Sequence, residues 1–139
     1  MVDLQVETDM ISRKQKQVVD DFQSMTDWQD RYRYLIDLGE SLSTLPKQYQ
    51  TDTFLIKGCQ SRVWLVKQVI NQRLSLLGFS DAAIVRGLMA MLIAIYQDGY
   101  VDAVKAATTD FLHEIGFDQY LSVTRFNGLQ LVIKAIHAG

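Results

Sequence analysis

The stretch SRVWLVKQVINQRLSL, residues 61–76, decides the fold that we predict for this chain. Its first half is rich in β-branched and aromatic residues, which favour a strand. Asn71-Gln72 can turn the chain, and residues 73–76 alternate between polar and apolar in the manner of a half-buried strand. The connection is too short for a parallel crossover, so the stretch predicts an antiparallel hairpin.

A third strand is predicted just before the hairpin. Phe54-Leu55-Ile56 is a short apolar run that ends near Gly58. A run of this length next to turn residues is typical of a strand. We therefore expect a small three-stranded antiparallel sheet.

Helical patterns occupy the chain on both sides of this sheet. Capping-box patterns at Ser12 and Thr26 predict two amphipathic helices, the second of which ends before Pro46. Ser80 is the expected N-cap of a third helix, apolar nearly all round and therefore buried. Shorter helices are predicted around residues 101–107 and 110–115, the latter capped by Gly116, and a last one around 126–136. The order of the elements predicts an α+β domain with a small antiparallel sheet packed against several helices.

The composition narrows the class of protein. The chain has 139 residues, 48% of them hydrophobic, which suits a single domain over residues 1–139 with one packed core. A net charge of −2 supplies no basic field for nucleic acid. The longest apolar run, residues 87–96, is too short to span a membrane, and the first residues lack a signal-peptide pattern. We expect a cytoplasmic protein with no nucleic-acid or membrane partner.

Cys59 is the only cysteine in the chain, which excludes an internal disulfide and fits a reducing compartment. A lone cysteine is commonly a small buried hydrophobe. Here, however, it follows Gly58 between two predicted strands, where a loop can present a reactive group. Lys57 and Arg62 are close in sequence, and positive charge lowers the pKa of a thiol. The context favours a reactive thiol but leaves the buried alternative open.

The residue inventory limits the chemistry that this thiol can perform. A zinc or cluster site needs about four ligands, and Cys59 with His113 and His137 cannot supply them. A dithiol mechanism needs a second cysteine, and a cysteine hydrolase needs a histidine base beside the thiol. Each histidine is more simply interpreted as structural. Carriage of a group received from a partner requires no second catalytic residue, so it is the chemistry that remains.

Four segments together resemble a known family. Residues 58–64, GCQSRVW, are similar to the GCQSxVW motif of the SufE family of sulfur-acceptor proteins. The other three segments, in order along the chain, are the helix pattern at residues 27–39, SDAAIVRGL at 80–88 and the LxxxRxxGL pattern at 121–129. The likeness covers roughly residues 15–137. Residues 1–11 match no part of the family pattern, and the sequence allows them to be disordered.

The resemblance implies a function and a partner. Proteins of the SufE family accept persulfide sulfur from a cysteine desulfurase, stimulate it, and deliver the sulfur toward iron–sulfur cluster assembly. The resemblance places the acceptor thiol at Cys59. It implies no cofactor of this chain's own, because the pyridoxal phosphate belongs to the partner, a SufS- or CsdA-like desulfurase. It also implies that the chain is not itself an enzyme, that a downstream sulfur acceptor or cluster scaffold exists, and that the fold is shared with the scaffold proteins of cluster assembly.

The same resemblance suggests roles for residues near Cys59. Gly58 is expected to be a hinge, and Gln60 and Ser61 to shape the loop by hydrogen bonds. Trp64 is either a wall of the pocket or plain core packing in the strand.

Asp81 and Arg125 match positions that recur near the partner surface of the family. The alternatives are a charge at a helix N-terminus for Asp81 and a surface ion pair for Arg125.

Two other functions stay open at this point. A stand-alone cysteine-dependent hydrolase requires a histidine near Cys59. A regulatory interaction module would act through its surface without using Cys59.

Overall fold

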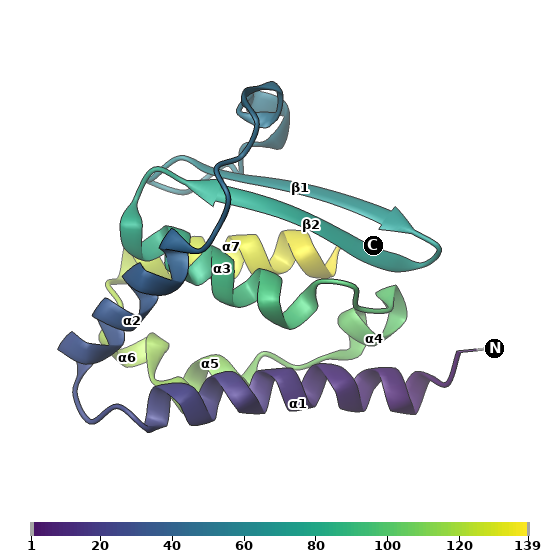
Figure 1. The fold of residues 1–139 in the computed structure, drawn as a ribbon, viewed down its shortest axis with the longest axis horizontal. Coiled ribbons are helices and arrows are strands. Elements are labelled where there is room, and N and C mark those ends of the chain that lie inside the picture. The colour runs from purple at the N-terminus through teal and green to yellow at the C-terminus, as the bar shows by residue number, and fades with distance from the viewer. Residues whose placement is uncertain (1, 139) are drawn as a thin grey trace.

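The computed structural model describes residues 2–138, and Figure 1 shows a long hairpin lying over two layers of helices. The elements are, in chain order, α1 (Leu4–Gln23), α2 (Trp28–Glu40), η1 (Lys47–Tyr49), η2 (Asp52–Phe54), β1 (Val63–Ile70), β2 (Arg73–Ser80), α3 (Ala83–Tyr96), α4 (Val101–Ala106), α5 (Asp110–Ile115), α6 (Phe117–Tyr120) and α7 (Val123–His137). The predicted α+β class is confirmed. No helix in this described part is both long and apolar enough to cross a membrane.

The predicted hairpin is present. β1 and β2 pair antiparallel from Val63↔Ser80 to Ile70↔Arg73. Asn71 and Gln72 form the turn with φ of 52° and 66°. Positive φ at both central residues characterises the two-residue turn whose twist matches that of paired strands.

The predicted third strand is wrong, and the sheet within residues 2–138 has two strands. Phe54 ends the short helix η2, and Leu55 makes only a single bridge to Trp64. Phe54 and Leu55 instead pack on a small apolar cluster on the outer face of the hairpin, built on Leu45, Trp64 and Val66. Packing there shields these apolar side chains without an extended strand, so the apolar run alone did not reveal the conformation.

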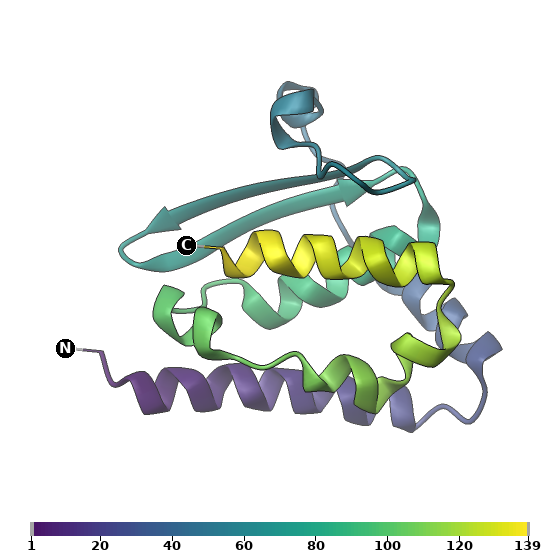
Figure 2. The same ribbon diagram turned by 180° about the vertical axis from the view of Figure 1, so that it is seen from behind.

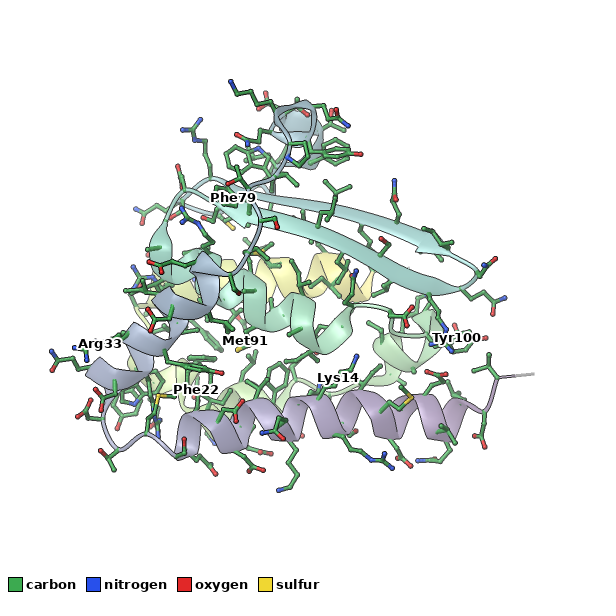
Figure 3. All side chains as sticks on the ribbon, viewed as in Figure 1. Lys14, Phe22, Arg33, Phe79, Met91 and Tyr100 are labelled. Atoms are coloured by element: carbon green, nitrogen blue, oxygen red, sulfur yellow. The ribbon has the colours of Figure 1, made fainter. Side chains whose placement is uncertain are left out.

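The two faces of the hairpin differ because successive strand residues point to opposite sides. Val63 and Leu65 join the main core, whereas Trp64 and Val66 belong to the outer cluster. Helices α3 and α7 lie directly beneath the inner face, and α1 lies farther from the hairpin, packed against α3, α4 and α5 (Figure 2). Figure 3 shows Phe22 of α1 and Met91 of α3 turned inward, and these side chains are 0% and 1% exposed.

The first helix begins earlier than its capping pattern predicted. Asp3 is the N-cap, with its carboxylate accepting hydrogen bonds from the backbone N–H of Gln5 and Val6. Ser12 therefore lies inside α1, and residues 4–11, which were expected to be able to remain disordered, are helical. Glu7 forms an ion pair of 2.6 Å with Arg73 at the hairpin, which ties this end of α1 to the sheet.

Helix α3 begins later than predicted. Ser80 is the last residue of β2 rather than the N-cap, and α3 starts at Ala83. The Ser80 side chain is fully buried and bonds two backbone groups beside it. The predicted cap of α5 is confirmed, because Gly116 has a φ of 100°.

Helices α2 and α3 cross at two glycines. A Cβ on Gly87 would lie 2.0 Å from the backbone oxygen of Leu35, and one on Gly39 would lie 2.7 Å from the backbone nitrogen of Gly87. Both obstacles are backbone atoms that cannot rotate away. The crossing therefore requires the absence of side chains at these positions.

Gly87→Ala is expected to lower the free energy of unfolding by at least about 2 kcal/mol, because overpacking against backbone forces the helices apart. Chemical denaturation monitored by circular dichroism measures the change. Gly78→Ala is the matched control, since its Cβ would meet the flexible end of Met89 at 2.4 Å. A loss for Gly87→Ala no larger than that of Gly78→Ala would contradict the close crossing.

Candidate functional site

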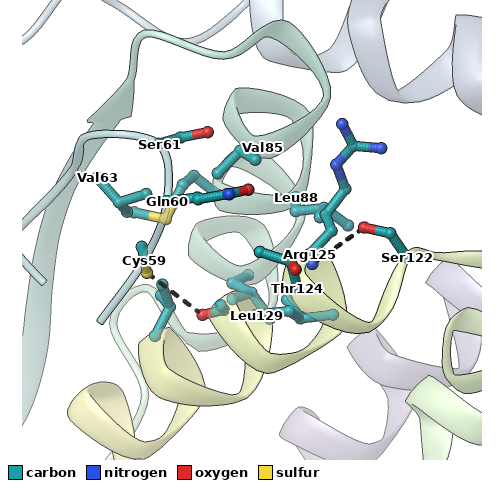
Figure 4. A pocket seen from close by; sticks show the side chains of 14 residues that line it. Cys59, Gln60, Ser61, Val63, Val85, Leu88, Ser122, Thr124, Arg125 and Leu129 are labelled. Atoms are coloured by element: carbon teal, nitrogen blue, oxygen red, sulfur yellow. Dashed lines mark hydrogen bonds between the residues drawn. The ribbon is translucent and has the colours of Figure 1, made fainter. Parts of the chain in front are cut away.

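Residues 58–62 form a loop that enters β1 and carries Cys59 at the edge of the hairpin. Gly58 has a φ of 95°, a conformation that residues with side chains rarely adopt. This turn directs Cys59 toward α7 beneath the sheet, as Figure 4 shows. Gly58 therefore occupies the position expected of a hinge, while hinge motion itself stays a prediction.

Cys59 lies at a cavity of about 90 Å³ between the loop, α3 and α7. Its deeper walls are apolar side chains from the hairpin and both helices, and its mouth is polar. The apolar walls are Val63, Val85, Leu88, Met89, Leu92, Leu129 and Val132. The polar mouth is formed by Gln60, Ser61, Ser122, Thr124 and Arg125.

The thiol is partly buried, and its Sγ lies 3.9 Å from the backbone oxygen of Gly128. Burial raises the pKa of Cys59 above the ordinary thiol value of 9.0. The sequence predicted the opposite direction from the nearby Lys57 and Arg62, and this prediction is wrong. The physical reason is that desolvation disfavours the thiolate, while the Arg62 side chain binds Asp81 instead.

Asp81 clamps the end of the Cys59 loop. Its carboxylate accepts a hydrogen bond of 3.1 Å from the backbone N–H of Arg62 and one of 3.3 Å from Arg62 Nε. In return, the backbone N–H of Asp81 donates to the oxygen of Arg62 at 3.3 Å. Asp81 does not line the cavity, so the structure places it as a support of the loop, and its contact with a partner stays a prediction.

Ser80 completes this support, a role that the sequence pattern did not reveal. Its buried hydroxyl donates to the backbone oxygen of Arg62 at 2.9 Å and accepts from the N–H of Ala82 at 3.2 Å. A serine before an aspartate and a helix is usually interpreted as a helix cap. This interpretation does not predict the hydrogen bond from Ser80 to the backbone oxygen of Arg62. Ser80 and Asp81 together join the loop to the start of α3.

Arg125 lines the same cavity as Cys59, and in Figure 4 its side chain extends away from Cys59. It lies in the first turn of α7, where its backbone N–H donates to the Ser122 hydroxyl at 3.1 Å. Its guanidinium forms no ion pair with any residue between 2 and 138. The alternative of a surface ion pair for Arg125 is therefore not found within residues 2–138, and a positively charged residue lines the mouth of the cavity.

Of the other predicted site residues, Gln60 and Ser61 line the cavity but Trp64 does not. Trp64 points to the outer face of the hairpin, where it is 6% exposed and packs with Leu45 and Val66. Strand alternation causes this, because Val63 already faces the cavity. Of the two alternatives for Trp64, core packing is the one that the structure shows.

Neither histidine lines the cavity. His113 is exposed and bonds Asp118 at 2.7 Å, which raises the pKa of the imidazole. His137 packs edge-on against Tyr96 near the end of α7, and burial lowers the pKa of its imidazole. The site accordingly offers no histidine base to Cys59. No three His, Cys, Asp or Glu side chains gather as a metal-binding group within residues 2–138.

Comparison with known proteins places this chain among proteins of iron–sulfur metabolism. Residues 16–139 match the sequence profile described as SufE, the Fe–S metabolism associated domain. An uncharacterized SufE-like protein of Rhizobium meliloti is 38% identical over 125 residues, covering 86% of this chain and 89% of the relative. One of Rhizobium etli is 39% identical over 125 residues, covering 86% and 84%. The chain belongs to the SufE family.

A solved structure shows the same fold. The solution structure of a hypothetical protein from Thermus thermophilus superposes with a TM-score of 0.73, covering 89% of this chain and 90% of that one. The sequence identity is 17%, so the likeness bears on the fold alone.

Replacing Asp81 by Ala is expected to speed the alkylation of native Cys59 by iodoacetamide about three- to tenfold, because two hydrogen bonds that close the loop are lost. The rate is measured by mass spectrometry under native conditions. Asp37→Ala, which removes an exposed carboxylate of α2, is the matched control. An unchanged rate in Asp81→Ala would show that the clamp does not limit access to the thiol.

Burial of the thiol also predicts a pH dependence. The thiolate is the reacting species, and its formation is disfavoured in the folded protein. Native Cys59 is therefore expected to react more slowly than the urea-unfolded chain at about pH 8, and its rate to go on rising above about pH 9. Folding favours the neutral thiol. The free energy of unfolding of wild type relative to that of Cys59→Ser is therefore expected to be constant well below about pH 9 and to fall as the pH rises further. Equal rates in the folded and unfolded chains would contradict the prediction.

Proposed function

We propose that this protein is a sulfur acceptor and carrier that takes persulfide sulfur from a cysteine desulfurase onto Cys59. It stimulates the desulfurase and delivers the sulfur toward iron–sulfur cluster assembly, by way of a downstream acceptor or scaffold in the cytoplasm. The partner is a SufS- or CsdA-like enzyme, and the pyridoxal phosphate stays with that partner. The protein itself acts as a transfer partner rather than as a separate enzyme.

The observation that carries the proposal is the setting of Cys59. A single thiol lies on a loop that turns at Gly58, and it lines a small cavity with both apolar and polar walls. A base, a metal group or a second thiol would be needed for most other cysteine chemistries. A carrier needs only that its thiol meet an activated sulfur and that the product be sheltered from water and reductants.

The transfer step balances without an added oxidant. The Cys59 thiolate attacks the outer sulfur of the persulfide on the desulfurase. A sulfur–sulfur bond forms at Cys59 while the sulfur–sulfur bond of the donor breaks, and the donor cysteine leaves as a thiolate. The step is analogous to thiol–disulfide exchange, in which thiolate fraction, leaving group and access set the rate.

The resting state of Cys59 suggests how the partner contributes. In the free protein the thiol is partly buried and its raised pKa keeps it protonated. Docking that opens the Asp81–Arg62 clamp would bring the thiol into a more polar setting and lower its pKa. Arg125 lines the same cavity, and a turn of its side chain toward Cys59 in the complex would favour the thiolate and the anionic persulfide.

The test is to incubate the protein with a cysteine desulfurase of each type and L-cysteine, and then to measure its intact mass without reductant. We expect wild type to gain sulfur that dithiothreitol removes, and Cys59→Ser to gain none and to lose stimulation of the desulfurase. Arg125→Ala is expected to slow transfer about tenfold, since a charged partner of the reacting group is lost.

Two outcomes contradict the proposal. If wild type gains no sulfur and Cys59→Ser still stimulates the desulfurase, the protein is a regulatory module. If wild type instead cleaves a thioester substrate and His113→Ala or His137→Ala abolishes that activity, it is a hydrolase.

A further inference from the structure

Gly128 is the one glycine among residues 2–138 whose presence the resting structure does not require. It lies inside α7, where glycine is less favourable than alanine. The other glycines each have a positive φ, or a Cβ added to them would come closer to a neighbouring atom than Cβ atoms normally do. These are Gly58 and Gly116, with φ of 95° and 100°, and Gly39, Gly78, Gly87 and Gly99, whose Cβ atoms would come within 2.9 Å of a neighbouring atom.

A Cβ on Gly128 would meet only the Sγ of Cys59, at 3.5 Å. No other heavy atom outside its immediate surroundings lies within 4 Å of that position. A separation of 3.5 Å is ordinary van der Waals contact. An alanine methyl would therefore fit beside the thiol, and the resting protein does not explain the glycine.

We propose that the missing side chain of Gly128 provides the seat of the outer sulfur when Cys59 carries a persulfide. The inference rests on the proposed function and adds a residue that determines which form of Cys59 the cavity can hold. The sulfur arrives as described above, with one sulfur–sulfur bond formed at Cys59 and one broken in the donor. Gly128 takes no part in that exchange and acts only by leaving space.

The argument is one of distance. The outer sulfur of a persulfide lies about 2 Å from Sγ, at the length of a sulfur–sulfur bond. A methyl group already in contact with Sγ leaves no room for a second sulfur between Cys59 and α7. Without the methyl group, the sulfur can lie against the Gly128 backbone beside Leu129, inside the cavity that Cys59 and both α7 residues line (Figure 4).

The residues around this seat would protect the persulfide from reductants. A persulfide in solution is attacked by thiol reductants through the same exchange that forms it. In the seat, its outer sulfur would face the apolar walls formed by Val63 and Leu129 rather than solvent. Room at position 128 thus decides whether the loaded loop can stay closed.

The experiment compares wild type with Gly128→Ala, and uses Gln130→Ala as the matched control. Gln130 is exposed on the same helix, so its replacement changes helix propensity without reaching the cavity. Each protein is loaded with inorganic polysulfide and, separately, with a cysteine desulfurase and L-cysteine. Native mass spectrometry then follows the persulfide during exposure to dithiothreitol.

We expect Gly128→Ala to retain sulfur for a half-life at least about fivefold shorter than wild type, the scale of an overpacking penalty. Its melting temperature should equal or exceed that of wild type. Alkylation of its unloaded thiol by iodoacetamide should be unchanged, because the methyl fits the thiol form. Gln130→Ala should behave as wild type in all three measurements.

The outcomes separate this inference from the proposed function. Equal persulfide half-lives in wild type and Gly128→Ala would overturn the role of Gly128 and leave the carrier function intact. A change in alkylation as large as the change in half-life would also overturn it, since the thiol itself would then be displaced. Failure of wild type to load from either donor would overturn both.

Discussion

The burial of the central turns of α3 is the constraint on which the rest of the fold depends. Eight of its fourteen residues are buried, and they lie all round the helix. The hairpin covers one side, α2 and α7 cover others, and α1 lies below (Figures 1 and 2). The close crossing with α2 at Gly39 and Gly87 brings two backbones into direct contact. Since α3 is anchored in this way, the segment immediately before it is held in place as well.

The candidate site takes its rigidity from that anchored segment. Ser80 ends β2 and Asp81 follows it before α3, and both residues hold Arg62, the last residue of the Cys59 loop. The Ser80 hydrogen bond to Arg62 is buried, whereas the Asp81–Arg62 ion pair is exposed to solvent. An exposed ion pair contributes little free energy, so the ion pair is the weaker of the two interactions. A surface that competes for Asp81 or Arg62 would release the loop without disturbing the core. Cys59 is thus partly buried, and the loop that carries it ends at the exposed Asp81–Arg62 pair.

The environment of Cys59 explains why charge near it in sequence was misleading. Lys57 and Arg62 suggested an activated thiol, but Arg62 is committed to Asp81, and burial raises the pKa of the thiol. The cation that does stand at the cavity is Arg125, far from Cys59 along the chain. A protonated and partly buried thiol is less reactive toward small thiols and oxidants than an exposed thiolate.

The sequence by itself determined the hairpin, its turn at Asn71-Gln72, the buried helix that follows and the place of Cys59 in a loop before the hairpin. These features rest on local periodicity, turn chemistry and a contiguous motif, all of which can be recognised along the chain. Only the tertiary structure decided that Phe54 and Leu55 pack on the hairpin instead of extending it, that α1 begins at Leu4, and that Trp64 faces away from the thiol. The same holds for the roles of Ser80 and Gly128. Each of these depends on contacts between residues distant in sequence, and such contacts exist only once the burial of α3 has brought the hairpin and α7 together.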